Sequence, residues 1–211
     1  MERREFIKKS SIITAGLGVG LGFLSCNQEH APVIIPDSEK IRIGIIGMGE
    51  RGGHIIKVLN ASPIFKVIAC CDILDFKLKE GQEKINGNPK PYTDYQEMLK
   101  NDELEAVIIS TPLHEHHRMA MDALDANVHI MCEKALAHDI EQSKAIKIKA
   151  QKSEKLFQVS YQYQLNPTFK AIKDIIHKGH CGQIVRVEAM WHRNSSWRRP
   201  VPSPGLEKQI N

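Results

Sequence analysis

Apolar residues between positions 41 and 160 come in short runs, and each run is followed by a stretch with helical spacing. The runs are rich in Ile, Val and Ala, which is typical of strands buried on both faces of a parallel sheet. They cover residues 41–46, 65–71, 106–109, 128–132 and 156–160. Helices are predicted near 50–59, 74–78, 95–100, 116–124 and 140–152. This alternation predicts an α/β fold, a doubly wound parallel Rossmann sheet with right-handed crossovers, over residues 41–163.

The pattern changes after residue 163. Asn166 and Pro167 are typical of a helix start, and Gly179 is typical of a helix end. Residues 182–191 then alternate apolar and polar, which predicts a strand with one buried face. We therefore expect residues 164–211 to be the incomplete start of an α+β substrate and oligomerisation domain with an antiparallel sheet.

The first 40 residues have the composition of an export signal and a linker. Residues 1–26 join a basic head to an uncharged, Gly-rich stretch, which predicts an export signal. The head resembles a twin-arginine signal, and the residues before Cys26 resemble a lipoprotein processing site. Cleavage at another residue, with Cys26 unmodified, is the alternative. With a linker over 27–40, we expect an exported protein, periplasmic or anchored in the membrane by lipid on Cys26.

Composition excludes several classes of protein. Of 211 residues, 42% are hydrophobic and 26% charged, a balance that fits neither a disordered tail nor a multi-span membrane protein. The net charge of +4 is too weak to indicate nucleic-acid binding. Five cysteines without a Cys-x-x-Cys pair indicate neither a disulfide scaffold nor structural zinc.

A glycine-rich segment, Gly47-Met48-Gly49-Glu50-Arg51-Gly52, connects the first predicted strand to the first helix. In a dinucleotide-binding turn, Gly47 makes the tight turn, Gly49 lets a pyrophosphate approach the backbone, and Gly52 lets the helix pack closely on the strand. Asp72 follows Gly52 by 20 residues, at the end of the second strand. Its carboxylate would accept hydrogen bonds from ribose hydroxyls and repel a 2′-phosphate, which favours NAD, while Arg51 leaves NADP open. A glycine turn that binds another ligand is the alternative.

Two more segments follow predicted strands. Ser110-Thr111-Pro112-Leu113-His114-Glu115-His116-His117 comes after the third strand, and Cys132-Glu133-Lys134-Ala135 closes the fourth. Both lie where open α/β sheets bind ligands. Together with the glycine segment, they resemble the Gfo/Idh/MocA family of sugar and polyol oxidoreductases, which carries Thr-Pro-x-His-x-His and Glu-Lys-Pro at these places. The resemblance covers residues 41–211.

The resemblance implies roles for single residues. Thr111 and Pro112 would lie against the nicotinamide, and Lys134 would face cofactor and substrate, with Glu133 orienting it. An ammonium at that place can hold the alkoxide-like charge that develops as hydride leaves. Lys134 and Glu133 are thus the expected catalytic residues. The expected cofactor-binding residues are Gly47, Met48, Gly49, Arg51, Gly52, Asp72, Thr111, Pro112, His116, Glu133, Lys134 and Gln162.

The chain departs from the family pattern at two places. Ala135 replaces the proline, so we expect a trans peptide bond after Lys134, since a non-proline cis bond costs ~3 kcal/mol. Residues 161–164 stand where members often carry Gln-Arg-Arg, and only Gln162 matches. The histidines between 114 and 117 lack the spacing of a zinc hydrolase, and we expect no metal.

These observations predict an NAD(P)-dependent oxidoreductase that transfers hydride between the nicotinamide cofactor and a sugar, a polyol or a derivative of one. Two alternatives stay open: a glycoside hydrolase of the same fold with a recycled NAD, and a non-catalytic NAD-binding fragment. Because family members continue well beyond this length, we expect the amino-terminal part of a longer protein that forms homo-oligomers when complete. The aromatic and basic cluster at 192–200 would line a carbohydrate pocket or pack a domain interface.

Overall fold

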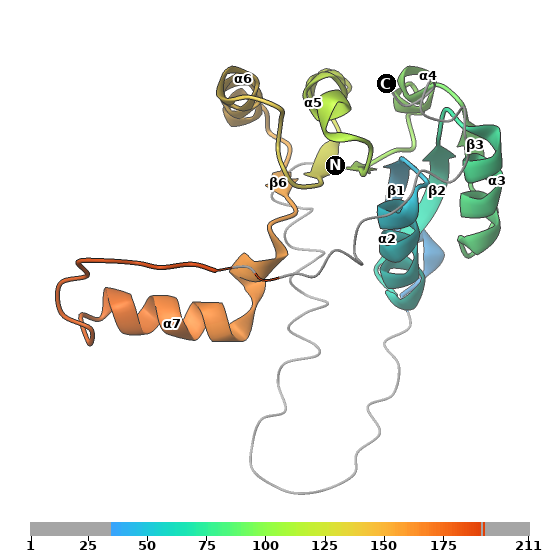
Figure 1. Ribbon diagram of the computed structural model, residues 1–211. Helices are drawn as coiled ribbons and strands as arrows, with labels where there is room; N and C mark the ends of the chain where they lie inside the picture. Colours follow the sequence, from blue (N-terminus) through green and yellow to red (C-terminus); the bar gives the residue numbers. More distant parts are fainter. Residues whose placement is uncertain (1–34, 191, 193–211) are drawn as a thin grey trace, which may run out of the picture. The chain divides into compact units, whose positions relative to one another are not determined.

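The computed structural model describes residues 35–190 and 192 (Figure 1), and its main feature is one six-stranded sheet. The strand order is β3-β2-β1-β4-β5-β6, and every neighbouring pair is parallel. The predicted Rossmann-like α/β fold is therefore confirmed. The strands are β1 (Ile41–Ile46), β2 (Phe65–Cys71), β3 (Lys90–Tyr92), β4 (Ala106–Ile109), β5 (His129–Cys132) and β6 (Phe157–Val159).

Helices cover the two faces of this sheet (Figure 1). On one face lie α2 (Glu50–Ala61) and α3 (Asp75–Lys84), and on the other lie α4 (Tyr95–Leu99), α5 (His116–Asp125) and α6 (Ile140–Lys152). Successive residues of β1 belong to different cores, since Ile45 packs with α2 and α3 whereas Ile46 packs with α4, α5 and α6. This is why the strand is apolar at nearly every position.

The edge strand β3 was not predicted from the sequence. Its residues Lys90, Pro91 and Tyr92 include no apolar run, and Pro91 cannot donate a hydrogen bond. It pairs with β2 alone, at the edge of the sheet. Proline is tolerated at an edge, where one side of the strand has no neighbour, so apolar periodicity gives no signal there.

The contacts divide the chain into two units, Met1–Gln162 and Tyr163–Asn211. The second contains α7 (Pro167–His177), which begins where the sequence predicts it. The Asn166 side chain caps this helix by accepting a hydrogen bond from Thr168 N. Gly179 follows the helix with a φ of 75°. Between the units runs η3 (Gln162–Leu165), a short 3₁₀ turn like η1 (Asp37–Glu39) and η2 (Leu113–Glu115).

The predicted strand over 182–191 does not form in the described residues 182–190. Val185 and Val187, which the alternation places on a buried face, are 90% and 81% exposed. A strand needs a neighbour for its N–H and C=O groups, and the described part of the second unit provides none. The predicted start of an antiparallel sheet is thus not confirmed.

Several predictions fall on residues that the structure does not describe. These are the export signal, the lipidation site at Cys26, most of the linker, and the cluster at 192–200 apart from His192. Over residues 35–190 and 192, none of the helices is both long and apolar enough to cross a membrane.

Candidate functional site

Three loops start at one level along the carboxyl edge of the sheet. The last residues of β1, β4 and β5 are in register, Ile46 beside Ile109 and Ile109 beside Cys132. Backbone hydrogen bonds continue the ladder one residue further, from Ser110 N to Ile46 O (2.8 Å) and from Glu133 N to Ile109 O (2.9 Å). The glycine loop, the Ser-Thr-Pro loop and the Glu-Lys loop are therefore adjacent, although they are far apart in sequence.

The three glycines of the first loop differ in what surrounds them. Gly47 has a φ of 95°, and a Cβ there would lie 2.8 Å from the backbone of Ser110. A Cβ on Gly52 would lie 2.1 Å from the carbonyl oxygen of Gly47. Gly49, the N-cap of α2, faces open space and has no side-chain cap. The loop is thus tightly packed at both ends and open over the start of the helix.

That opening suits the pyrophosphate of a dinucleotide. N–H groups at the start of a helix lack intrahelical partners, and the helix dipole makes this end positive. Phosphates bind at such ends, provided that no side chain fills the approach. The bare backbone at Gly49 meets this condition.

Asp72 lies next to the glycine loop, on the β2 side of β1. Its Oδ2 accepts a hydrogen bond from Met48 N at 2.7 Å, and its Oδ1 accepts one from Leu74 N at 2.9 Å. Two backbone groups therefore fix the carboxylate. A carboxylate has about four acceptor positions, so sites remain for the two hydroxyls of a ribose.

Arg51, in the first turn of α2, points in the opposite direction across the sheet. Its Nε and Nη2 both lie 2.6 Å from Oε1 of Glu133, and Nη2 is 3.5 Å from Ser160 Oγ. Glu133 and Ser160 follow β5 and β6, whereas Asp72 follows β2 at the other side of β1. Arg51 was the residue that could have bound the 2′-phosphate of NADP. Its guanidinium is instead paired with Glu133, which is only 5% exposed. Sequence reasoning did not predict this ion pair, because no local spacing connects the two residues.

The Glu133 carboxylate also meets the next residue. Its Oε2 accepts a hydrogen bond from the backbone N of Lys134 at 3.3 Å, so this contact uses the main chain of Lys134 and not its ammonium. The Lys134 side chain is exposed. The peptide bond from Lys134 to Ala135 is cis, and the expectation of a trans bond was wrong. That expectation counted only the local cost, whereas the carbonyl of Ala135 is held by His116 from another element.

The Ser-Thr-Pro loop is attached to the glycine loop by Ser110 and is more exposed at its next two residues. Ser110 Oγ donates to the carbonyl of Gly47 at 2.8 Å, which joins this loop to the glycine loop. Thr111 is half-buried and Pro112 is exposed. His116 is 1% exposed, and its ring nitrogens lie 2.7 Å from Ala135 O and 3.0 Å from Thr111 O.

The thiols near this edge belong to buried strand residues. Burial raises the pKa of the Cys70 thiol to about 11, and those of Cys71 and Cys132 to about 12, so these groups stay protonated and unreactive at neutral pH. Among the described residues, no three His, Cys, Asp or Glu side chains come together in a way that could hold a metal ion.

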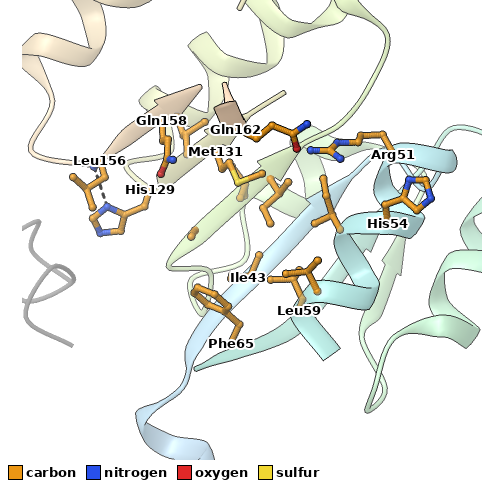
Figure 2. A pocket seen from close by; sticks show the side chains of 16 residues that line it. Ile43, Arg51, His54, Leu59, Phe65, His129, Met131, Leu156, Gln158 and Gln162 are labelled. Atoms are coloured by element: carbon orange, nitrogen blue, oxygen red, sulfur yellow. Dashed lines mark hydrogen bonds between the residues drawn. The ribbon is translucent and has the colours of Figure 1, made fainter. Parts of the chain in front are cut away.

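An apolar cleft of 620 Å³ lies on the sheet face beside α2, over β4, β5 and β6 (Figure 2). The sequence did not predict this cleft. Strands that are apolar on both faces do not reveal where the described helices leave part of a face uncovered. Ile108, Ile130 and Met131 form part of its lining. Arg51 and Gln162 point toward each other in Figure 2 and belong to its polar part. Gln162, a predicted cofactor residue, is thus placed beside α2.

Fold, glycine loop and carboxyl-edge loops together define an NAD-binding Rossmann domain. The model of the Gfo/Idh/MocA oxidoreductase family, described as having an NAD-binding Rossmann fold, matches residues 41–161. The chain belongs to this family.

Three relatives show what the chain is similar to. An α-N-acetylgalactosaminidase from Shewanella oneidensis is 28% identical, over 94% of this chain and 50% of the relative. An inositol 2-dehydrogenase from Salmonella paratyphi B is 28% identical, over 74% of this chain and 47% of the relative. The crystal structure of myo-inositol dehydrogenase from Lactobacillus casei with NAD(H) and myo-inositol is 26% identical, with a TM-score of 0.63, over 66% of this chain and 42% of that one. The chain spans about half the length of the curated relatives that it matches.

Two adjacent glycines provide a test of the packed loop. Gly52→Ala places a methyl group against the carbonyl of Gly47, and we expect it to lower the free energy of unfolding by about 1–3 kcal/mol or more. Gly53→Ala is the matched control, since a Cβ there meets nothing within 4 Å, and we expect equal or greater stability. Urea unfolding followed by circular dichroism measures both. Equal stability of the two variants would contradict the described packing.

Proposed function

We propose that this chain is the cofactor-binding part of an NAD-dependent oxidoreductase that transfers hydride between the nicotinamide and a carbinol carbon of a sugar or polyol. One observation carries the proposal: an open glycine loop, a Thr-Pro loop and an exposed lysine follow three adjacent, in-register strands. Kinship with inositol dehydrogenases supports the substrate class.

The cofactor would lie across the carboxyl edge of the sheet. Backbone groups around Gly49 would bind the pyrophosphate, and Asp72 would accept hydrogen bonds from the adenosine ribose. Because Arg51 is paired with Glu133, the charge nearest a 2′-phosphate would be that of Asp72, which favours NAD. NAD supplies the hydride acceptor when it is bound.

Lys134 would act on the substrate hydroxyl. Its exposed ammonium can donate a hydrogen bond to the oxygen that becomes more negative as hydride leaves the carbon. Glu133 would set the start of this loop, because it binds both Arg51 and the backbone of Lys134. Thr111 and Pro112, on the neighbouring loop, would lie against the nicotinamide.

A glycoside hydrolase with the same cofactor is the second candidate. The similarity to the α-N-acetylgalactosaminidase extends over 94% of the chain, compared with 74% for the inositol 2-dehydrogenase. In that reaction NAD would be reduced and reoxidised within one cycle. Release of nitrophenol from a nitrophenyl glycoside without net NADH would support the hydrolase, and stoichiometric NADH formed from a polyol would support the dehydrogenase.

Export, a lipid on Cys26 and homo-oligomers of the full-length protein are further proposals. Export and the lipid rest on residues 1–26, whose basic head and uncharged stretch have the composition of a signal. The oligomer rests on resemblance to the family alone.

A glycine pair tests the proposed cofactor site. Gly49→Ala meets nothing within 4 Å in the free chain, so we expect normal folding, but the methyl group would obstruct the pyrophosphate. NADH fluorescence titration of the purified chain should show binding weakened roughly tenfold or more. Gly53→Ala, which is equally unhindered, should bind NADH like the wild type. Unchanged binding in Gly49→Ala would place the cofactor elsewhere.

Lys134→Ala separates a catalytic protein from one that only binds NAD. In an active preparation of the protein, we expect kcat to fall about 10²–10³-fold, because a donor to the developing oxyanion is lost. NADH affinity should change far less. Steady-state kinetics on a polyol or a glycoside, paired with the same titration, measures both quantities. Full activity of this variant would remove the role assigned to the ammonium.

A further inference from the structure

His116 is the one histidine of the 114–117 segment that is buried. It is the first residue of α5 and is 1% exposed, whereas His114 is exposed and His117 is half-buried. Its Nδ1 lies 2.7 Å from the carbonyl oxygen of Ala135, and its Nε2 lies 3.0 Å from the carbonyl oxygen of Thr111. One ring therefore touches the loop after β4 and the loop after β5.

Both partners of the ring are acceptors. A carbonyl oxygen cannot donate, and a neutral imidazole carries only one N–H. With a single proton on the ring, one nitrogen lone pair would face a carbonyl lone pair at hydrogen-bond distance. Both contacts are hydrogen bonds only if both ring nitrogens carry protons.

We propose that His116 donates from both ring nitrogens, as an imidazolium, and is a positioning residue that holds the Lys134 loop against the Thr111 loop. It would not touch the cofactor, since the ring is buried and both nitrogens are occupied. Its effect on the reacting groups rests on the proposed function. By fixing Ala135, the residue after Lys134, it would place the ammonium beside the segment expected to meet the nicotinamide.

Charged groups on the neighbouring segments pair with one another. Glu115 pairs with Arg118 and lies 3.6 Å from His114, and Glu133 pairs with Arg51. No contact described for His116 is to a carboxylate. The positive end of α5 opposes the charge, whereas two charge-assisted hydrogen bonds to carbonyls offset the cost of burying it. The charged and titratable groups of α5 and of the loops after β4 and β5 are, besides His116, His114, Glu115, His117, Arg118, Asp122, Asp125, Glu133, Lys134, His138 and Asp139.

The hydrogen-bond ladder explains why such a contact is needed. Regular pairing of β4 with β5 ends at Ile109 and Cys132, and the last bond of the ladder reaches Glu133. Thr111 and Ala135 lie beyond it. The two carbonyls cannot bond to each other, because both are acceptors, so a double donor between them is the group that can join them.

The protonation state is measured directly by NMR on the cofactor-free chain. Long-range ¹H–¹⁵N spectra of protein labelled at histidine nitrogen distinguish protonated from unprotonated ring nitrogens, and loss of the signals in His116→Gln assigns them. At neutral pH we expect two protonated nitrogens for His116. One protonated and one unprotonated nitrogen would overturn the proposal. This result does not depend on NAD binding, and circular dichroism shows whether the variant used for the assignment is folded.

The positioning role has its own test. Gln can donate from only one nitrogen, so we expect His116→Gln to bind NADH roughly tenfold more weakly than the wild type. His114→Gln, at an exposed position, should differ less than twofold. If the wild type binds NADH and His116→Gln, shown by circular dichroism to be folded, binds it equally well, the positioning role is wrong. If the wild type itself fails to bind NADH, the proposed function fails, and the NMR result still decides the state of His116.

Discussion

The candidate site depends on the hydrogen-bond ladder between parallel strands. Because β1, β4 and β5 are paired in register to their last residues, the loops that follow them begin side by side. The ladder then extends one step beyond the strands, at Ser110 and Glu133. Parallel pairing thus gathers segments that are 63 residues (Gly47 to Ser110) and 23 residues (Ser110 to Glu133) apart in the chain, without any contact between their side chains being required first.

Side-chain contacts then connect the loops beyond the last backbone hydrogen bonds of the ladder. Ser110 joins the first two loops, Arg51 and Glu133 link the start of α2 to the end of β5, and His116 connects Thr111 to Ala135. None of these contacts uses the open backbone at Gly49 or the side chain of Lys134, so both stay accessible to a ligand. A hydride-transfer site needs this division, since its reacting groups must be accessible while their backbone stays fixed.

The two candidate reactions place the same demands on these residues. Both need a bound NAD and a group that stabilises charge on a substrate oxygen, and Gly49, Asp72 and Lys134 would serve either. The choice between a dehydrogenase and a hydrolase therefore depends on groups other than these three. Relatives of both kinds match this chain over about half of their own length.

The sequence by itself determined the sheet, its apolar strands and the glycine turn, because burial on both faces and the steric needs of a tight turn act on consecutive residues. Periodicity could not reveal β3, whose edge position removes the need for apolar residues. It also predicted a strand at 182–191, and residues 182–190 find no strand to pair with among the described residues. The pairing of Arg51 with Glu133, the burial of His116 and the cis bond before Ala135 were decided by tertiary structure alone. Each depends on which loops the strand order brings together, and strand order is a property of the whole sheet and not of any local stretch.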